Sequence, residues 1–575
     1  MSAKIVRRET VSDSHLSHIS QPIIRQIFAS RGIEDASQLD KRAKALLHYQ
    51  HLSGMDAAVQ VLSEALEKQL KIIIVGDFDA DGATSTSLTM LCLAKMGASG
   101  HSYLVPNRFD FGYGLSPEIV QVAHQQGAQL IITVDNGIAC FDGVDKAKEL
   151  GIKVLVTDHH LAADRLPQAD AIVNPNQPGC EFLSKNLAGV GVAFYLMLAL
   201  RNHLKQTQWF DKKAIPEPNL AEFLDIVALG TVADVVPLDS NNRVLVYQGL
   251  QRIRSGKCRP GIKALVEVAG KSPERMVSSD LGFVLGPRLN AAGRLDDMSL
   301  GIECLLAADH SKARQMAVEL DSLNRERREI QQSMQDQALA SLETLAIDGD
   351  QTKNGIIVYQ ADFHQGVIGI VAGKIKEKYN RPTIAFAHQD DDTLKGSARS
   401  IAGLHIRDLL EEINSRYPDV IVKFGGHAMA AGLTIHADKL AAFKRVFEQV
   451  SHELLKDRDL SGQILSDGEL SHQEFSLEFA QQLKDSGPWG QGFPEPIFDG
   501  IFTPVDQKLL GGKHLKLMLK AESGVLVDAI AFNIDPQLWP NPSCKQIHIA
   551  YKLDINEFRG RVSLQLMVEA LEPIL

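Results

Sequence analysis

Short apolar runs alternate with helix-forming stretches through the first half of the chain. The run Ile72–Val75 leads into a polar loop and then into a helix-forming stretch, residues 83–96. That loop carries Asp77, Asp79 and Asp81. Continuous apolar runs of this length, bounded by polar loops, are typical of strands buried on both faces of a parallel sheet. The pattern therefore predicts an α/β fold whose first large domain has a doubly wound parallel sheet.

Two later apolar runs also end in acidic residues. Residues 130–134 are followed by Asp135, and residues 152–156 are followed by the sequence TDHH at 157–160. Since the carboxyl ends of parallel strands meet at one edge of a sheet, where such folds bind ligands, we expect these side chains to gather there. A further carboxylate, Asp234, ends an apolar helix-like run.

The acidic triplet indicates a metal site. Three carboxylates within five residues repel one another unless a multivalent cation lies between them. For the triplet alone, a solvated acidic turn is the alternative, and the later acidic motifs make that alternative the less favoured one. An EF-hand calcium loop begins in the same way, but it needs a glutamate at position 12, where this chain has Leu88.

The ligand types favour manganese or magnesium over zinc. Carboxylate oxygens with one or two imidazoles suit the harder ions, whereas zinc prefers sulfur and nitrogen. Two such ions form a clamp that supports displacement at phosphorus. Asp135 is the candidate bridge between them.

Seven motifs stand in order along the chain: DxDxDG at 77–82, VDNG at 134–137, TDHH at 157–160, TVADVVPL at 231–238, GPRLNAAGR at 286–294, SARS at 397–400 and GGHAMAAG at 425–432. The first four resemble the motifs of the DHH phosphoesterase superfamily. The last three resemble its bacterial RecJ branch of single-strand-specific 5′→3′ DNA exonucleases. The resemblance covers nearly the whole chain and departs at no ligand position.

The resemblance implies a role for each site residue. The implied ligands of two Mn²⁺ or Mg²⁺ ions are Asp77, Asp79, Asp81, Asp135, His159 and Asp234. Asp77, Asp79 and Asp135 would hold one ion, and the remaining ligands together with Asp135 would hold the other. Asp158 would orient a ligand, and His160 would stabilise charge or donate a proton at the scissile phosphate. The implied reaction is digestion of single-stranded DNA from its 5′ end to 5′-mononucleotides.

The resemblance also implies a set of substrate-binding residues: Arg108, Arg288, Asn290, Ser397, Arg399, Gly425, Gly426 and His427. An arginine fork can pair two phosphate oxygens, and glycines let main-chain amides approach a phosphate. Taken alone, however, an arginine is more often a surface charge, and a glycine-rich turn is more often plain loop geometry. The aromatic residues beside Arg108, which are Phe109, Phe111 and Tyr113, belong either to the core or to a stacking platform.

Five segments are expected: a helical lead-in at 1–50, a DHH catalytic domain at 51–304, a connecting helix at 305–345, a second α/β domain of the DHHA1 type at 346–457 and a C-terminal β-barrel at 458–575. The connecting helix is predicted from apolar residues at three- to four-residue steps, and its charge cluster at 325–329 is best explained as a solvated face. Alternating strands after a Gly/Pro connector, residues 487–496, predict the barrel, and the resemblance implies that it is an OB-fold. Its basic residues either follow a nucleic acid backbone or merely solubilise the outer face.

Composition is compatible with this organisation. A chain of 575 residues is too long for one core, and 45% hydrophobic with 23% charged residues is ordinary for a soluble protein. Six scattered cysteines without CxxC spacing, no apolar signal core and no run long enough to span a bilayer predict a cytoplasmic protein without a membrane partner. A net charge of −11 does not exclude a nucleic acid substrate, because six acidic residues are concentrated in one site.

The resemblance further implies partners and a setting. Single-stranded DNA would be the substrate, and single-strand-binding protein and a recombination helicase would be partners of a monomer. The setting would be DNA repair, recombination and mismatch repair. The alternatives are DHH enzymes that cleave short oligoribonucleotides, cyclic dinucleotides or pyrophosphate, and a non-catalytic replication scaffold with the same fold. The intact ligand set and the extra C-terminal domain favour an enzyme that acts on long polymers.

Overall fold

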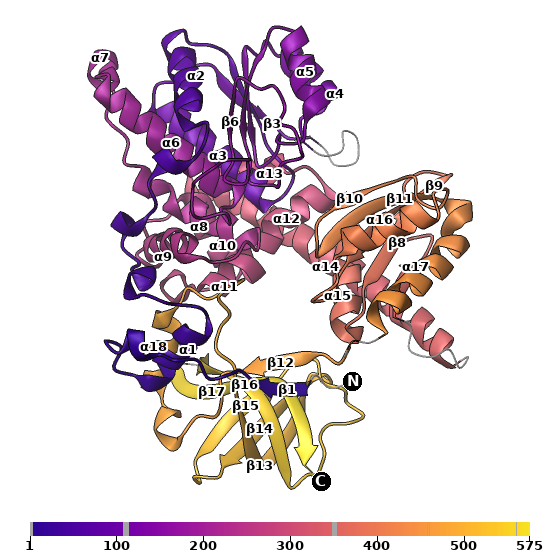
Figure 1. The fold of residues 1–575 in the computed structure, drawn as a ribbon. Coiled ribbons are helices and arrows are strands. Elements are labelled where there is room, and N and C mark those ends of the chain that lie inside the picture. Colours follow the sequence, from indigo (N-terminus) through magenta and orange to yellow (C-terminus); the bar gives the residue numbers. More distant parts are fainter. Residues whose placement is uncertain are drawn as a thin grey trace. The chain divides into compact units, whose positions relative to one another are not determined.

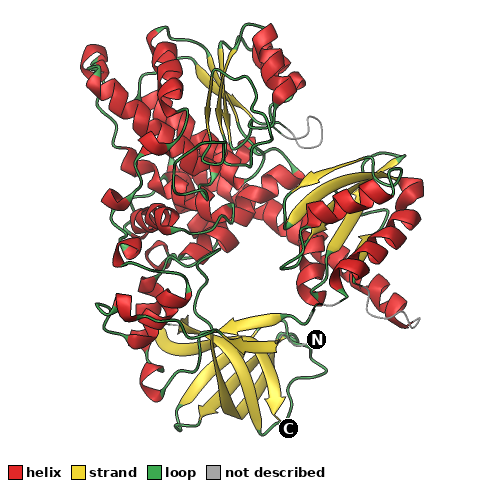
Figure 2. Cartoon of the chain, viewed as in Figure 1, coloured by secondary structure: helices red, strands yellow, loops and turns green. Residues whose placement is uncertain are grey.

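A computed structural model describes residues 4–106, 114–347, 354–456, 458, 460–558 and 560–574. Contacts group the chain into two units (Figure 1). We call Glu9–Asn324 with Gln473–Pro496 the N-terminal unit, and Met1–Arg8, Arg325–His472 and Ile497–Leu575 together the C-terminal unit. The first is rich in helices around one sheet, and the second contains a mixed sheet and a barrel (Figure 2).

The sheet of the N-terminal unit is parallel throughout, in the order β3-β2-β4-β5-β6. Its strands are β2 (Ile72–Val75), β3 (His101–Leu104), β4 (Leu130–Val134), β5 (Lys153–Thr157) and β6 (Ala171–Val173). Every residue of β2 and β4 is buried, which explains their continuous apolar runs. Alternate residues such as Ile73 and Ile131 pack against α4 and α5, while α3 and α6 contact the sheet from the other face (Figure 1). The doubly wound prediction is confirmed.

Helices make up most of the rest of the N-terminal unit. They are α1 (Pro22–Ser30), α2 (Met55–Glu67), α3 (Ala80–Lys95), α4 (Pro117–Gln125), α5 (Phe141–Glu149), α6 (Gly189–Gln206), α7 (Trp209–Lys213), α8 (Leu224–Ala233), α9 (Ser240–Arg254), α10 (Pro260–Val268), α11 (Ser278–Asp280), a π-helical turn (Leu281–Leu285), α12 (Gly286–Leu295), α13 (Ser299–Leu306) and α18 (Leu477–Ser486). The helix after the acidic loop begins at Ala80 instead of residue 83, because Asp79 accepts a capping hydrogen bond from the N–H of Gly82.

The long connecting helix, α14, spans His310–Ile347, so its predicted start at 305 is wrong. The chain breaks after α13, and Asp309 caps the new helix by accepting from the N–H of Lys312 over 2.9 Å. Its charge cluster is solvated except at Arg327, which is 9% exposed and donates to Gln331. The single solvated face that the pattern predicted is therefore interrupted by a buried arginine.

The mixed sheet of the C-terminal unit has the order β10-β11-β9-β8-β7. Its elements are β7 (Ile356–Tyr359), α15 (Ile368–Tyr379), β8 (Thr383–His388), β9 (Thr393–Arg399), α16 (Ile406–Arg416), β10 (Lys423–Gly426), β11 (Ala430–His436) and α17 (Leu440–Leu455). Aromatic contacts among Phe386, Phe443 and Phe447 lie in its core. Strand β10 includes the glycine pair of the GGHAMAAG motif, and Gly425 pairs with Gly432 across the sheet.

The C-terminal barrel is closed in the order β13-β14-β15-β17-β16. Its strands are β13 (Phe498–Leu510), β14 (His514–Ala521), β15 (Leu526–Ala531), β16 (Gln546–Phe558) and β17 (Arg561–Ile574). Alternate residues of β14 are buried, as a barrel interior requires. A separate parallel pair joins β1 (Lys4–Arg7) to β12 (Gln463–Ser466). The lead-in was predicted to be helical, so β1 is a correction.

Contacts divide the segment after residue 458 between the two units. Helix α18 and the connector up to Pro496 belong to the N-terminal unit, and the first barrel strand starts at Phe498. All six cysteines lie in the described part of the chain, and none of them is paired in a disulfide. Within the described ranges, no helix combines the length and apolar character needed to cross a bilayer.

Candidate metal centre

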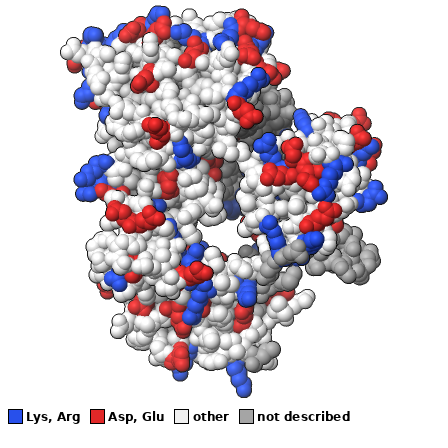
Figure 3. All heavy atoms as spheres, viewed as in Figure 1, with Lys and Arg blue, Asp and Glu red and all other residues white. Residues whose placement is uncertain are grey.

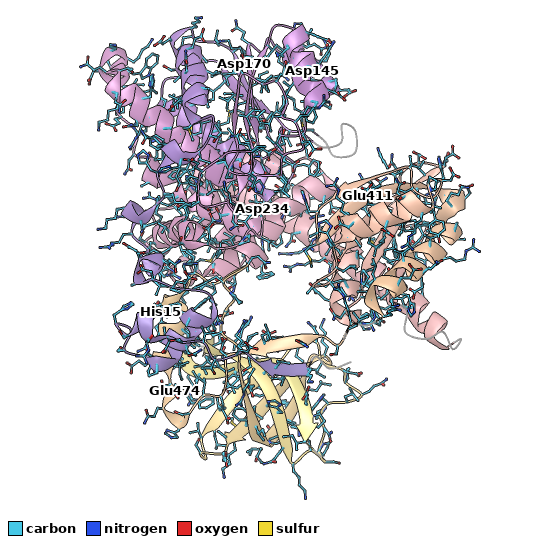
Figure 4. All side chains as sticks on the ribbon, in the orientation of Figure 1. His15, Asp145, Asp170, Asp234, Glu411 and Glu474 are labelled. Atoms are coloured by element: carbon cyan, nitrogen blue, oxygen red, sulfur yellow. The ribbon has the colours of Figure 1, made fainter. Side chains whose placement is uncertain are left out.

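The acidic motifs meet at the carboxyl edge of the parallel sheet. Asp77 stands two residues beyond β2, Asp135 directly follows β4, and Asp158 directly follows β5. Since β2, β4 and β5 are neighbouring parallel strands, their ends lie side by side. Asp234 approaches from the end of α8, where Figure 4 labels it. The sequence prediction of one shared edge is thus confirmed.

His159 links two carboxylates at this edge. Its Nε2 atom lies 3.1 Å from Oδ1 of Asp135 and 3.5 Å from Oδ2 of Asp234. Three groups have ligand atoms within 4.8 Å of one another: Asp135, His159 and His160; Asp81, His159 and Asp234; and Asp77, Asp79 and Asp135. All six predicted ligands occur in these groups.

Asp135 occupies a tightly built corner. It is 2% exposed and has a φ of 62°, in the left-handed region that aspartate and asparagine tolerate better than most residues. Asn136 fixes the turn by donating to the carbonyl oxygens of Val75 and Val134. A Cβ added at Gly189 would lie 2.6 Å from the Cβ of Asp135, so only glycine fits there. Burial, together with the charges of Asp81 and other nearby carboxylates, raises the pKa of Asp135 well above its ordinary value.

Asp81 is held by the start of α6. Its carboxylate accepts main-chain hydrogen bonds from Gly189 over 2.6 Å and from Val190 over 2.9 Å. Burial, reinforced by the charge of Asp79, raises the pKa of Asp81 to about 7, and the two amides only partly offset this rise. Burial and neighbouring carboxylates also raise the pKa of Asp234. Such an accumulation of buried negative charge needs a counter-charge.

Asp158 orients the histidine pair. Its Oδ1 atom lies 2.7 Å from Nδ1 of His160 and accepts from the N–H of His159, while its Oδ2 atom accepts from the N–H of Ile138. Burial acts to raise the pKa of Asp158, but the contacts with His160 outweigh it and bring that pKa below its ordinary value. Conversely, burial acts to lower the pKa of His160, and Asp158 reverses the effect and raises it.

The site fits a hard divalent cation. Its donors are carboxylate oxygens and imidazole nitrogens, with no thiolate among the described groups. Oδ2 of Asp234 is buried and makes no hydrogen bond with any described residue, although His159 Nε2 lies within ion-pair distance. A buried carboxylate oxygen that makes no hydrogen bond is suited to coordinate a metal ion. The predicted ligand set therefore agrees with the geometry.

Residues of the GPRLNAAGR motif support the acidic loop. Asn290 accepts from the N–H of Ala80 over 2.8 Å, and a Cβ at Gly293 would lie 1.8 Å from the carbonyl oxygen of Phe78. Arg288 forms a buried ion pair with Asp321 at 2.8 Å. The predicted substrate contacts of Arg288 and Asn290 remain predictions, and the structure gives both residues a packing role that the sequence did not reveal.

The remaining substrate-binding candidates lie in the C-terminal unit. Ser397 and Arg399 end β9, and the Nη1 atom of Arg399 donates to Oγ of Ser397 over 3.0 Å. Gly425 and Gly426 lie in β10, separated from β9 by the single strand β11. His427 follows directly in the turn. Burial lowers the pKa of Arg399, and a Cβ at Gly369 would come within 2.7 Å of its Nη2 atom, so the guanidinium covers the first turn of α15.

The predictions made for Arg108 and for the aromatic residues beside it have no structural test. Arg108, Phe109, Phe111 and Tyr113 lie outside the described residues. On the face shown in Figure 3, basic and acidic side chains are interspersed among the described residues, and no continuous basic stripe stands out.

Comparisons with known proteins place the chain in a class. Sequence models of the DHH family N-terminal domain, the DHHA1 domain and the RecJ OB domain match residues 71–231, 352–453 and 466–570. Fold and site together thus define a DHH-family protein with a DHHA1 domain and a barrel. The single-stranded-DNA-specific exonuclease RecJ of Escherichia coli is 55% identical over 569 residues, 99% of each chain. The chain belongs to the RecJ family.

Other relatives match this chain over nearly all of its length. RecJ of Haemophilus influenzae is 53% identical over 577 residues, which cover 100% of both chains. The crystal structure of RecJ in complex with Mn²⁺ from Thermus thermophilus matches with a TM-score of 0.81 at 28% identity. That match covers 99% of this chain and 79% of the other. A second structure of the same relative contains Mg²⁺ and matches with a TM-score of 0.75 at 26% identity.

Proposed function

We propose that this protein is a single-stranded-DNA-specific exonuclease that digests its substrate 5′→3′ to 5′-mononucleotides with two Mn²⁺ or Mg²⁺ ions. The observation that carries the proposal is the set of ligand groups at the carboxyl edge of the parallel sheet. They occur in a chain whose E. coli relative, a single-stranded-DNA-specific exonuclease, is 55% identical over 99% of both chains. The metal-containing structures of the Thermus relative support the choice of ions.

The ligand groups support the division between two ions that the family resemblance implies. Asp77, Asp79 and Asp135 form one group, and Asp81, His159 and Asp234 form another. Asp135 also falls in a group with His159, as a bridging ligand should. When bound, two divalent ions lower the pKa of a water molecule and neutralise charge on the phosphate oxygens.

The histidine pair contributes proton chemistry of its own. The 2.7 Å contact between Nδ1 of His160 and Oδ1 of Asp158 fixes the orientation of the His160 ring. Because its pKa is raised, His160 keeps its proton to a higher pH than a free histidine. We propose that it stabilises the phosphate charge or donates a proton to the leaving oxygen.

In this proposal the C-terminal unit binds the DNA strand. Ser397, Arg399 and His427 would bind backbone phosphates of the strand, together with the glycine pair of β10. The barrel would bind the strand further along. Family membership alone supports the remaining expectations: a cytoplasmic monomer in DNA repair, recombination and mismatch repair, with single-strand-binding protein and a recombination helicase as partners.

The test compares strands labelled at one end. A single strand carrying a 5′ label should release a labelled mononucleotide at once in the presence of Mn²⁺, whereas a 3′ label should appear in mononucleotide only at the end of digestion. Chelation of the metal should stop both reactions. Duplex DNA, a cyclic dinucleotide and pyrophosphate serve as alternative substrates. Release from the 3′ label first, or faster cleavage of any alternative substrate, would contradict the proposal.

A further inference from the structure

The loop that follows Asp234 is held by a segment from far along the chain. This loop, residues 235–239, joins α8 to α9. The main-chain N–H of Leu238 donates to the carbonyl oxygen of Gln491 over 2.7 Å. Gln491 belongs to the connector, residues 487–496, which packs within the N-terminal unit. The metal-ligand loop and the connector therefore share a main-chain hydrogen bond.

Two glycines let the connector approach the loop closely. A Cβ at Gly490 would lie 2.7 Å from Cδ1 of Leu238, and a Cβ at Gly492 would lie 3.1 Å from Cβ of Pro237. Gly492 has a φ of +70°, and the turn is closed by hydrogen bonds in both directions between Gly490 and Phe493. A side chain at Gly492 would press on Pro237 in the loop, whereas a side chain at Gly490 would press on the side chain of Leu238.

The connector is itself anchored firmly. Trp489 stacks on Phe493 with ring centroids 5.0 Å apart, and the carbonyl oxygen of Trp489 accepts from Oγ of Ser278. The guanidinium of Arg243 lies 4.3 Å from the ring centroid of Phe493. The same arginine donates to the carbonyl oxygen of Leu238 over 2.8 Å. Both main-chain polar groups of Leu238 are thus fixed by this assembly.

The other end of the loop is strained. Val235 has a φ of 63°, a conformation that β-branched residues rarely adopt. Such strain persists only where the surroundings hold the chain on both sides. Directly before it, the carboxylate of Asp234 faces Nε2 of His159. The position of this carboxylate therefore depends on a loop whose far end the connector fixes.

We infer that the connector is a positioning element for Asp234. It fixes residues 237 and 238, holds the strained turn at Val235 in place and sets the distance between the Asp234 carboxylate and His159. The connector thereby tunes the affinity of the site for a divalent cation. This inference rests on the metal role of Asp234 in the proposed function.

A matched pair of glycine substitutions tests the inference. Gly492→Ala and Gly256→Ala impose the same backbone cost, since both glycines have a φ of +70°, but a Cβ at Gly256 meets nothing within 4 Å. Mn²⁺ binding to the DNA-free, full-length protein is measured from the loss of the free-ion signal in electron paramagnetic resonance. Gly492→Ala should weaken Mn²⁺ binding about tenfold, as loss of a ligand-orienting contact does, whereas Gly256→Ala should match the wild type. Equal affinities in the two variants would overturn the inference.

An Asp234→Asn background shows whether the effect passes through Asp234. Asp234→Asn alone should weaken Mn²⁺ binding, and adding Gly492→Ala should then weaken it no further. A further tenfold loss in the double variant would overturn the inference while leaving the metal role of Asp234 intact. If Asp234→Asn alone binds Mn²⁺ with wild-type affinity, Asp234 is not a metal ligand and the inference fails as well. If Gly492→Ala does not fold, Gly490→Ala replaces it, because its added Cβ meets the flexible end of Leu238.

Discussion

Nδ1 of His160 lies 2.7 Å from Oδ1 of Asp158, a carboxylate that is itself buried. The same aspartate accepts from the main-chain N–H groups of His159 and Ile138. Its contacts therefore fix the ring of His160 and the main chain of the neighbouring ligand together. Asp158 itself belongs to none of the ligand groups found among the described residues, so we expect it to act through the histidines.

Asp158→Asn should slow turnover about 10- to 100-fold while changing Mn²⁺ affinity little, because it loosens the orientation of His160 without removing a ligand. Asp170→Asn is a matched control. Asp170 also accepts a main-chain hydrogen bond on this sheet, from Val154, and it belongs to none of the ligand groups found among the described residues (Figure 4). Single-turnover cleavage of a labelled strand measures the effect. Wild-type turnover in Asp158→Asn would contradict the orienting role.

Asp135→Asn should abolish cleavage, because removal of the proposed bridging ligand would cost several kcal/mol of transition-state stabilisation. Asparagine is the better choice than alanine, since the residue has a φ of 62°. The metal-free variant should melt at a higher temperature than the metal-free wild type, because its buried site contains one carboxylate fewer.

Thermal unfolding with chelator and with Mn²⁺ checks this expectation for Asp135→Asn. Mn²⁺ should raise the melting temperature of the wild type and reverse the order of the two proteins. Asp145→Asn, on the exposed side of α5, provides the control and should behave as the wild type in both conditions (Figure 4). If Asp135→Asn cleaves at nearly the wild-type rate, Asp135 is not a ligand of the metal centre.

Arg399→Ala should weaken binding of single-stranded DNA while leaving Mn²⁺ affinity unchanged, because Arg399 lies in the C-terminal unit and the ligand groups lie in the N-terminal unit. A charge-assisted contact to phosphate is worth about 1.5–3 kcal/mol, so affinity should fall roughly 10- to 100-fold. Arg445→Ala removes an exposed charge from α17 of the same unit as a control. Fluorescence anisotropy with a short labelled strand gives the affinities. The phosphate role is wrong if the two variants bind equally well.

Local patterns predicted the metal centre because its parts are local. Strands β2 and β4 have the predicted bounds, and the acidic residues follow their strands directly. The rule that parallel strand ends share an edge then brings distant motifs together without further information. The clustered carboxylates repel one another, and this repulsion predicts a bound cation even without a known distance.

Long-range contacts were beyond the reach of these patterns. The pairing of β1 with β12 joins Lys4 to Gln463, and no periodicity in either segment indicates its partner. The same holds for Gly189, which approaches Asp135 closely and donates to Asp81, and for the connector against the loop after Asp234. From its Gly/Pro-rich composition the connector, residues 487–496, resembles a simple linker. In the structure its glycines are required because it packs closely against the loop after Asp234.

Arg7→Met should destabilise the C-terminal unit by about 1 kcal/mol, because Arg7 binds the buried carboxylate of Asp499 but is itself half exposed to solvent. Burial acts to raise the pKa of Asp499, and hydrogen bonds from Arg7, Ser466 and His548 outweigh it and lower that pKa below 3.8. The stabilisation is therefore present above pH 4 or so and is lost as the pH falls through the folded-state pKa.

Urea unfolding of the wild type and Arg7→Met between about pH 3 and 7 measures this difference. The gap in unfolding free energy should be constant at neutral pH and should shrink in the acid. Arg416→Gln, which breaks exposed pairs with Glu412 and Glu453, should show no gap at any pH. A gap for Arg7→Met that grows on acidification would show that Asp499 is not its source.

Two shortened proteins separate the role of the barrel from that of the connector. A chain ending at residue 457 lacks α18 and the connector, which pack in the N-terminal unit, so it should lose Mn²⁺ affinity and stability. A chain ending at residue 496 keeps both and lacks only the barrel strands. It should still cleave short strands in the presence of metal.

The chain ending at residue 496 should nevertheless bind long strands more weakly than the full-length protein, because it loses contacts to distant phosphates and bases. Each phosphate contact releases counterions, so the logarithm of the binding constant falls linearly with the logarithm of the salt concentration, and the slope counts the contacts. Removal of the barrel should make that slope shallower for long strands and leave it unchanged for strands of a few nucleotides. Anisotropy titrations across a salt series, with both strand lengths, supply the comparison. If the slope for long strands stays the same in a soluble, metal-binding protein, the basic residues of the barrel only solubilise its outer face.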